Sequence, residues 1–99
     1  MISHTVLFRL RPELNEAERL QAAVTFKRDI EGLLAVIPFL RKIHVGLNIN
    51  PDEQWHICLN AWLDNMEDVR SYAIHPEHVN AAARLKPAIA ERACVDCEL

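Results

Sequence analysis

Ninety-nine residues can bury one hydrophobic core but not two, so we expect a single domain over residues 1–99. Hydrophobic residues make up 51% and charged residues 25% of the chain, which is the balance of a globular protein rather than of a disordered or fibrous one. The formal net charge is -3 and the basic residues are scattered in ones and twos, so nucleic acid is not an expected partner.

The first half of the chain predicts a strand, a helix and a second strand. Residues 2–10 alternate as a strand does, and one face of it carries His4, Val6, Phe8 and Leu10. Asn15 and Glu18 have the spacing of a capping box, so a helix should begin there and end before Pro38. Apolar residues at every third or fourth position form its stripe: Leu20, Ala23, Phe26, Ile30, Leu33 and Ile37. Residues 39–45 predict the second strand.

The second half continues with a third strand and two helices. The strand at residues 55–63 has Trp55, Ile57, Leu59, Ala61 and Leu63 on one face and His56, Cys58, Asn60 and Trp62 on the other. Asp64 is expected to cap a short helix that stops near His75. Pro76 suits the first turn of a further helix, which Pro87 ends or kinks. The apolar stripe of that helix consists of Val79, Ala82, Leu85 and Ile89.

Residues 92–99 predict a last strand, so the order is strand, helix, strand, strand, broken helix, strand. This order is typical of an α+β, ferredoxin-like βαββαβ fold with a four-stranded antiparallel sheet. Helices cover only one face of such a sheet, yet the strand at residues 55–63 carries large apolar groups on both faces, with Trp62 on the second. We therefore expect a homodimer that buries the second face.

Three cysteines cannot all pair within one chain, which argues against a secreted disulfide framework. Cys94 and Cys97 are an odd number of positions apart on a strand and should point to opposite faces, so we interpret them, with Cys58, as reduced packing residues. The N-terminus has no signal core, and no apolar run approaches the roughly 20 residues that cross a bilayer. We expect no membrane partner and a cytoplasmic location.

The chain resembles the stress-responsive A/B barrel (Dabb) domain family in five segments that occur in the family's order. They are HTVLFR at 4–9, VGLN at 45–48 with NP at 50–51, Trp55, YAIHPEH at 72–78 and RACVD at 92–96. The resemblance implies a ferredoxin-like monomer that dimerises sheet against sheet, with a barrel between the subunits. It leaves the activity open, because the superfamily includes monooxygenases, haem-degrading enzymes and lyases, and many Dabb members have no assigned activity.

One plant member of the family is a polyketide cyclase, and the resemblance implies counterparts of its site in this chain. Its catalytic tyrosine and histidine fall on Tyr72 and His78, and a pocket histidine falls on His4. A histidine can remove a proton from carbon beside a carbonyl, and a tyrosine hydroxyl can stabilise the oxyanion that develops. The chain departs from this pattern in the third strand, where Ile57 replaces a pocket histidine and His56 should face the other way.

The same residues also have structural explanations. Tyr72 can pack its ring in the core with its hydroxyl at the rim, and His78 lies in the first turn after Pro76. His75 can end one helix where Pro76 begins the next. His75 and His78 could share a metal, but no third ligand stands at a recognised spacing. His4 should face the interior, where a histidine is either hydrogen-bonded or lines a cavity.

We hypothesise a homodimer of undetermined biochemical activity that binds a small apolar molecule in the barrel. Its candidate ligand-binding residues are His4, Phe8, Trp62 and His75. The alternative is a small cofactor-independent enzyme of the polyketide cyclase or lyase type, which needs Tyr72, His78 and His4 to border one cavity. A haem- or metal-assisted oxygenase is a third hypothesis without a recognised ligand set, so we expect no metal and no other cofactor.

Overall fold

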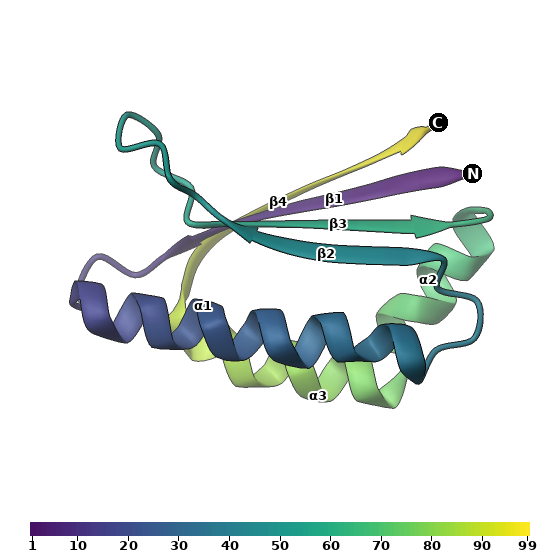
Figure 1. Ribbon diagram of the computed structural model, residues 1–99, viewed down its shortest axis with the longest axis horizontal. Helices are drawn as coiled ribbons and strands as arrows, with labels where there is room; N and C mark the ends of the chain where they lie inside the picture. The colour runs from purple at the N-terminus through teal and green to yellow at the C-terminus, as the bar shows by residue number, and fades with distance from the viewer.

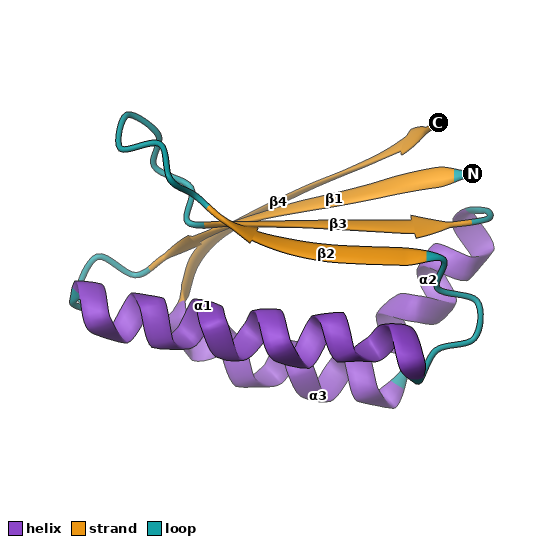
Figure 2. Cartoon of the chain, in the orientation of Figure 1, coloured by secondary structure: helices purple, strands orange, loops and turns teal.

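Three helices cover one face of a four-stranded antiparallel sheet and leave its other face bare, as Figure 1 and Figure 2 show. The computed structural model describes residues 1–99. Its elements are β1 (Ile2–Leu10), α1 (Glu16–Glu31), β2 (Lys42–Leu47), β3 (Ile57–Leu63), α2 (Met66–Ile74), α3 (Pro76–Leu85) and β4 (Ile89–Glu98), with 3-10 turns at Gly32–Ala35 and Lys86–Ala88. The strand order is β2-β3-β1-β4, which confirms the expected ferredoxin-like α+β fold.

The central strand β1 fixes which residues face the helices. Its residues are alternately buried and half-buried, as the sequence predicted. The antiparallel register with β4 places His4 opposite Asp96, although the two are 92 positions apart in the chain. Figure 1 shows β1 and β4 side by side with the two chain termini at the same end. The pairing of the chain ends therefore brings polar groups of β4 beside the interior face of β1.

The predicted capping box of α1 is confirmed. The Oδ1 atom of Asn15 accepts a hydrogen bond from the backbone N–H of Glu18 at 2.8 Å, and the Glu18 carboxylate accepts one from the backbone N–H of Asn15 at 2.9 Å. The predicted stripe is buried from Ala23 onward, but Leu20 is 56% exposed. Leu20 lines a hollow on the surface together with Leu47 and does not reach the core.

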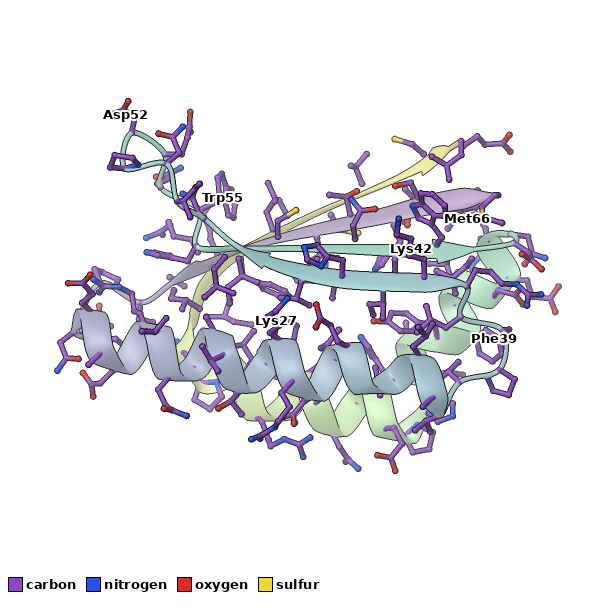
Figure 3. The ribbon with its side chains drawn as sticks, viewed as in Figure 1. Lys27, Phe39, Lys42, Asp52, Trp55 and Met66 are labelled. Carbon is purple, nitrogen blue, oxygen red and sulfur yellow. The ribbon has the colours of Figure 1, made fainter.

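The edge strand β2 is fastened to α1 by two charged side chains. Lys27 Nζ donates to the carbonyl of Val45 at 2.6 Å and to Glu31 Oε2 at 2.7 Å. The same carboxylate oxygen accepts the backbone N–H of Val45 at 2.9 Å. Figure 3 shows Lys27 between α1 and β2. Edge-strand groups that would otherwise lack partners are thus satisfied from the helix layer.

Several predicted boundaries were wrong by a few residues. The strand expected at 39–45 is Lys42–Leu47, because residues 38–40 form a turn after Ile37. The strand expected to open at Trp55 begins at Ile57, and Figure 3 shows Trp55 on the loop that projects from the sheet. The last strand begins at Ile89 rather than Arg92, because the 3-10 turn that contains Pro87 leads directly into it.

Asp64 does not cap α2, as the sequence had suggested. Asn65 is the cap, and its Oδ1 atom accepts the backbone N–H of Asp68 at 2.8 Å. Asp64 instead accepts two hydrogen bonds from the Arg41 guanidinium, at 3.1 and 2.9 Å. This ion pair lowers the pKa of Asp64 through the hydrogen bonds of Arg41.

The apolar side of α3 is divided between the core and a cavity. Ala81 and Leu85 are buried in the core, whereas the predicted stripe residue Val79 is half exposed. Val79 and Ala82 line a cavity that faces β4. Part of the stripe is thus a cavity wall, which periodicity does not distinguish from a core contact.

The bare face of the sheet carries Trp62, whose ring lies 4.4 Å from the Lys42 ammonium. The three cysteines are free, and the register places Cys94 opposite Val6 on one face and Cys97 opposite Ser3 on the other, as expected. No helix has the length and apolar character needed to cross a membrane.

Candidate functional site

Tyr72 lies in α2 and is the largest fully buried side chain, at 1% exposure. Its hydroxyl is buried and has no hydrogen-bond partner. Burial raises the pKa of Tyr72 far above its ordinary value, so the hydroxyl keeps its proton at neutral pH. The hydroxyl lies inside the core rather than at its rim, which was the structural explanation that the sequence offered. The site therefore holds a buried O–H donor without an acceptor.

His78 lies beside this tyrosine, in the first turn of α3. The two ring centroids are 4.5 Å apart, with the planes inclined by 52°. The Nδ1 atom of His78 is 3.0 Å from the carbonyl oxygen of Ala73. A carbonyl can only accept, so Nδ1 carries the proton and the neutral ring keeps its lone pair on Nε2.

Burial is the main cause that lowers the pKa of His78, and electrostatic repulsion from His4, then Arg92 and His75, lowers it further. The hydrogen bond to Ala73 acts in the opposite direction without reversing the shift. At neutral pH the ring is therefore uncharged, with Nε2 able to accept a proton. This is the protonation state that a general base requires.

His4 contributes the third group, from the interior face of β1. It is 8% exposed, and its ring centroid is 6.0 Å from that of Tyr72. Its Nδ1 atom lies 2.6 Å from Asp96 Oδ1, so the buried imidazole donates to a carboxylate. Of the two alternatives for His4, the structure shows the hydrogen-bonded one. The pair connects β1 to β4 beside the tyrosine.

His4, Cys94 and Asp96 also have ligand atoms within 4.8 Å of one another, and they are the group of side chains here that could approach a metal together. The sulfur of Cys94 is 3.7 Å from Nδ1 of His4. The same Nδ1 atom is hydrogen-bonded to Asp96, and this hydrogen bond explains why the His4 and Asp96 side chains lie together.

A cavity of about 620 Å³ lies next to these groups, between α3 and β4. Its apolar wall consists of Phe8, Ala73, Val79, Ala82, Ala83 and Ile89. Its polar wall consists of Arg11, His78, Lys86 and Arg92. The volume is in the range of sites that hold small molecules.

The structure brings together four of the six residues expected at a site. His4, Tyr72 and His78 form one cluster, and Phe8 joins His78 at the cavity. Tyr72 and His4 stand behind the cavity wall rather than in it. The requirement that all three border one cavity is therefore not met by the unliganded chain.

Trp62 and His75 lie elsewhere. Trp62 is on the bare face of the sheet, opposite Lys42 and Ser3 in register, so the sheet itself separates it from His4. His75 caps α3, and its Nδ1 atom accepts the backbone N–H of Glu77 at 3.2 Å. This confirms the architectural interpretation of the His75–Pro76 pair.

His56 also behaves differently from the expectation of simple alternation. It precedes the start of β3, and its Nδ1 atom accepts the backbone N–H of Leu10 at 2.9 Å. It borders a separate hollow with Leu10 and Arg19. Burial lowers the pKa of His56, with a smaller contribution from Arg19. His56 is therefore a backbone partner at the end of β1, remote from the Tyr72 cluster.

The helix-facing side of β4, which carries Arg92, Cys94 and Asp96, was not predicted as part of the site. The alternation of the strand was a signal for it, because these residues occupy every second position of β4. Arg11 and Lys86 were also missed as cavity residues, since both lie just outside regular elements.

Comparisons with known proteins agree with the ferredoxin-like fold. Among solved structures, the chain is similar to a dimeric protein of unknown function and ferredoxin-like fold from Bacteroides fragilis, with 48% identity, a TM-score of 0.97 and coverage of 99% of this chain and 95% of that one. A dimeric ferredoxin-like protein of unknown function from Thermobifida fusca is 27% identical, with a TM-score of 0.81 and coverage of 99% and 90%.

Among characterised proteins, olivetolic acid cyclase from Cannabis sativa is 22% identical over 81 residues, which cover 79% of this chain and 76% of the cyclase. Residues 2–99 match the family model described as the Stress responsive A/B Barrel Domain, Dabb. The chain therefore belongs to the stress-responsive A/B barrel (Dabb) family.

Proposed function

We propose that this protein is a homodimeric, cofactor-independent enzyme that acts on a small, largely apolar carbonyl compound bound between α3 and β4. The observation that carries the proposal is the buried Tyr72 hydroxyl, which has no partner and lies beside an imidazole with a free Nε2 atom. An unpaired buried donor costs about 1–3 kcal/mol, so proteins seldom keep one without a use.

The proposed step is proton abstraction from the carbon next to the ligand's carbonyl. Nε2 of His78 takes the proton, the electron pair of the broken C–H bond forms the C=C bond of an enolate, and the π pair of the carbonyl moves to its oxygen. The Tyr72 hydroxyl donates a hydrogen bond to that oxyanion. The raised pKa of Tyr72 supports this role, because the hydroxyl stays protonated and remains a donor. An aldol-type ring closure or a lyase reaction would both begin in this way.

The ligand must approach past the cavity wall to meet Tyr72. His78 borders the cavity and also contacts the tyrosine ring, so it stands at the point of entry. A ligand carbonyl that moves in beside His78 would give the tyrosine hydroxyl the acceptor that it lacks. The free energy of that unmade hydrogen bond favours such an approach.

This location differs from the barrel between the subunits that the sequence analysis expected. The cavity lies on the helix side of the sheet, whereas the barrel would be lined by the opposite face, where Trp62 lies. The homodimer remains part of the proposal, because the bare sheet face needs a cover and the similar proteins from B. fragilis and T. fusca are dimeric. Binding and dimerisation would then use different faces of the sheet.

The proposal is tested by following deuterium exchange at the carbons next to the carbonyl of 2-octanone, by NMR in deuterium oxide. We expect the wild-type protein to accelerate exchange and His78→Asn to reduce the acceleration by about 10²–10⁴-fold, the usual contribution of a general base. Asparagine keeps an N–H that can donate to the Ala73 carbonyl, so folding is retained while the base is lost. Equal rates for the two proteins would refute the catalytic role.

Binding without turnover is the second candidate, and it is favoured by the fact that Tyr72 and His4 do not line the cavity. The same experiment separates the two functions. A protein that only binds would retain 2-octanone, visible as line broadening of the ketone signals, without any exchange that depends on His78.

A further inference from the structure

The cavity beside His78 is unusual for its charge. Three of its ten lining residues are the cations Arg11, Lys86 and Arg92, and no aspartate or glutamate lines it. The chain as a whole has 14 acidic and 11 basic residues. A cationic wall in a chain with a net negative charge is therefore a local arrangement rather than a result of composition.

The ion pairs of the protein strengthen this contrast. Five of its eleven lysines and arginines pair with a carboxylate: Arg9, Lys27, Arg28, Arg41 and Arg84. The three cations of the cavity pair with none. Their charges are therefore available to a ligand.

One of these cations is held in place by the backbone. The backbone N–H of Arg11 donates to the carbonyl of Ala88 at 2.8 Å, and its Nε atom donates to the carbonyl of Pro87 at 2.9 Å. These bonds fix Arg11 against the turn that contains Lys86, while the terminal nitrogens of the guanidinium remain free. A preorganised guanidinium loses less entropy when it binds an anion.

Lys86 and His78 lie at opposite ends of α3. His78 lies in the first turn of α3 and Lys86 follows its last residue. The two are eight positions apart, which corresponds to roughly 12 Å along the helix axis. The wall between them is apolar and includes Val79, Ala82 and Ala83. Arg92 also lines the cavity, from β4, where it lies opposite Phe8 in register.

From this arrangement we infer that the ligand is an amphipathic anion, with a carboxylate or phosphate group held by Arg11, Lys86 and Arg92 and an apolar chain lying along α3 towards His78. The inference rests on the proposed function and adds the class of ligand to it. The three cations are exposed, so the head group of an amphipathic anion could pair with them while its chain covers the apolar wall, whereas a neutral apolar molecule could do only the second.

The test compares octanoate, octyl phosphate, the neutral analogue octanamide, and acetate by isothermal titration calorimetry. Methyl NMR signals of Val79 and Ile89 report on the cavity, and that of the exposed Ile49 serves as a distant reference. We expect octanoate or octyl phosphate to bind more tightly than octanamide and acetate, with shifts at Val79 and Ile89 only. The tighter of the two anions identifies the head group.

The variants Lys86→Gln and Arg92→Gln each remove one charge from the cavity. The matched control is Arg70→Gln, because Arg70 is an exposed residue of α2 that does not line the cavity. Each cavity variant should weaken octanoate binding about two- to fivefold, the value of a partly exposed ion pair, and the double variant more. Octanamide binding and the control should be unchanged. Raising the salt concentration from about 0.05 to about 0.5 M should weaken binding of the anions only.

The outcomes separate the two proposals. Equal binding of octanoate and octanamide at Val79 and Ile89, or a double variant that binds octanoate like the wild type, overturns the inference and leaves the cavity of the proposed function in place. If no probe shifts Val79 or Ile89, both fail together. If the protein binds octanoate as expected but the exchange of 2-octanone does not depend on His78, the proposed catalysis alone is overturned.

Discussion

Replacement of Tyr72 by phenylalanine should make the protein more stable and less active. The hydroxyl is buried without a partner, so the folded chain bears its desolvation cost of about 1–3 kcal/mol. Tyr72→Phe removes that cost and leaves the ring, which packs at 4.5 Å from His78 and 6.0 Å from His4. In most proteins the same substitution is destabilising, because a buried tyrosine hydroxyl usually donates a hydrogen bond.

The expected effect is large enough to measure in a chain of this size. A gain of about 1 kcal/mol raises the midpoint of thermal unfolding by roughly 4–8 °C for a domain of 60–100 residues. Calorimetry at one fixed protein concentration is the assay, since a dimer's midpoint depends on concentration. The rate of deuterium exchange into 2-octanone should fall in the same variant by about 10²–10³-fold, the usual loss when one hydrogen-bond donor to an oxyanion is removed.

Tyr72→Leu is the companion variant that removes the ring as well. It should destabilise the protein by about 2–5 kcal/mol, as other large-to-small changes in a core do. A midpoint that falls in Tyr72→Phe would refute the reasoning, because it would mean that the hydroxyl makes a hydrogen bond in the folded dimer. Unchanged exchange in Tyr72→Phe would refute its role as a donor.

Three further predictions concern pH, the β1–β4 contact and the dimer. The pKa of His78 is lowered in the folded chain, so its contribution to stability is present above the unfolded pKa of about 6.5 and is lost as pH falls through the folded pKa. The urea midpoint of the wild type should therefore fall between about pH 7 and pH 5, and that of His78→Asn should fall less. The same decrease in both proteins would contradict this. Asp96→Ala leaves the buried His4 without its acceptor and should cost about 1–3 kcal/mol in urea unfolding, while the exposed Glu98→Ala, two positions along the same strand, should cost little. Trp62→Lys should convert the dimer to a folded monomer in light scattering, because it places a second ammonium beside Lys42 inside an interface of at least about 1,200 Å². Arg70→Glu should remain dimeric, and a dimeric Trp62→Lys protein would show that the bare face is not the interface.

Local signals account for much of what the sequence predicted correctly. The alternation of β1 identified His4 as an interior residue, and the capping box at Asn15 identified the start of α1. The His75–Pro76 pair predicted the break between α2 and α3, because a proline fixes the start of a helix wherever it occurs. Each of these features depends on residues that are near one another in the chain.

The remaining parts of the site depend on the register between distant strands. Asp96 meets His4 only because β4 pairs with β1 in one particular alignment, and no local pattern specifies that alignment. Trp62 was grouped with His4 although alternation had already placed the two on different faces of the sheet. The cationic wall is also nonlocal, since Arg11 follows β1 near the N-terminus whereas Lys86 and Arg92 lie near the C-terminus.

A crystal structure of the protein with 2-octanone tests the proposed mechanism most directly. The geometry predicts the ketone between α3 and β4, with its carbonyl oxygen about 2.7–2.8 Å from the Tyr72 hydroxyl and the neighbouring carbon about 3–3.5 Å from Nε2 of His78. A ketone bound between the two sheets beside Trp62, with the Tyr72 hydroxyl still unpaired, would contradict it.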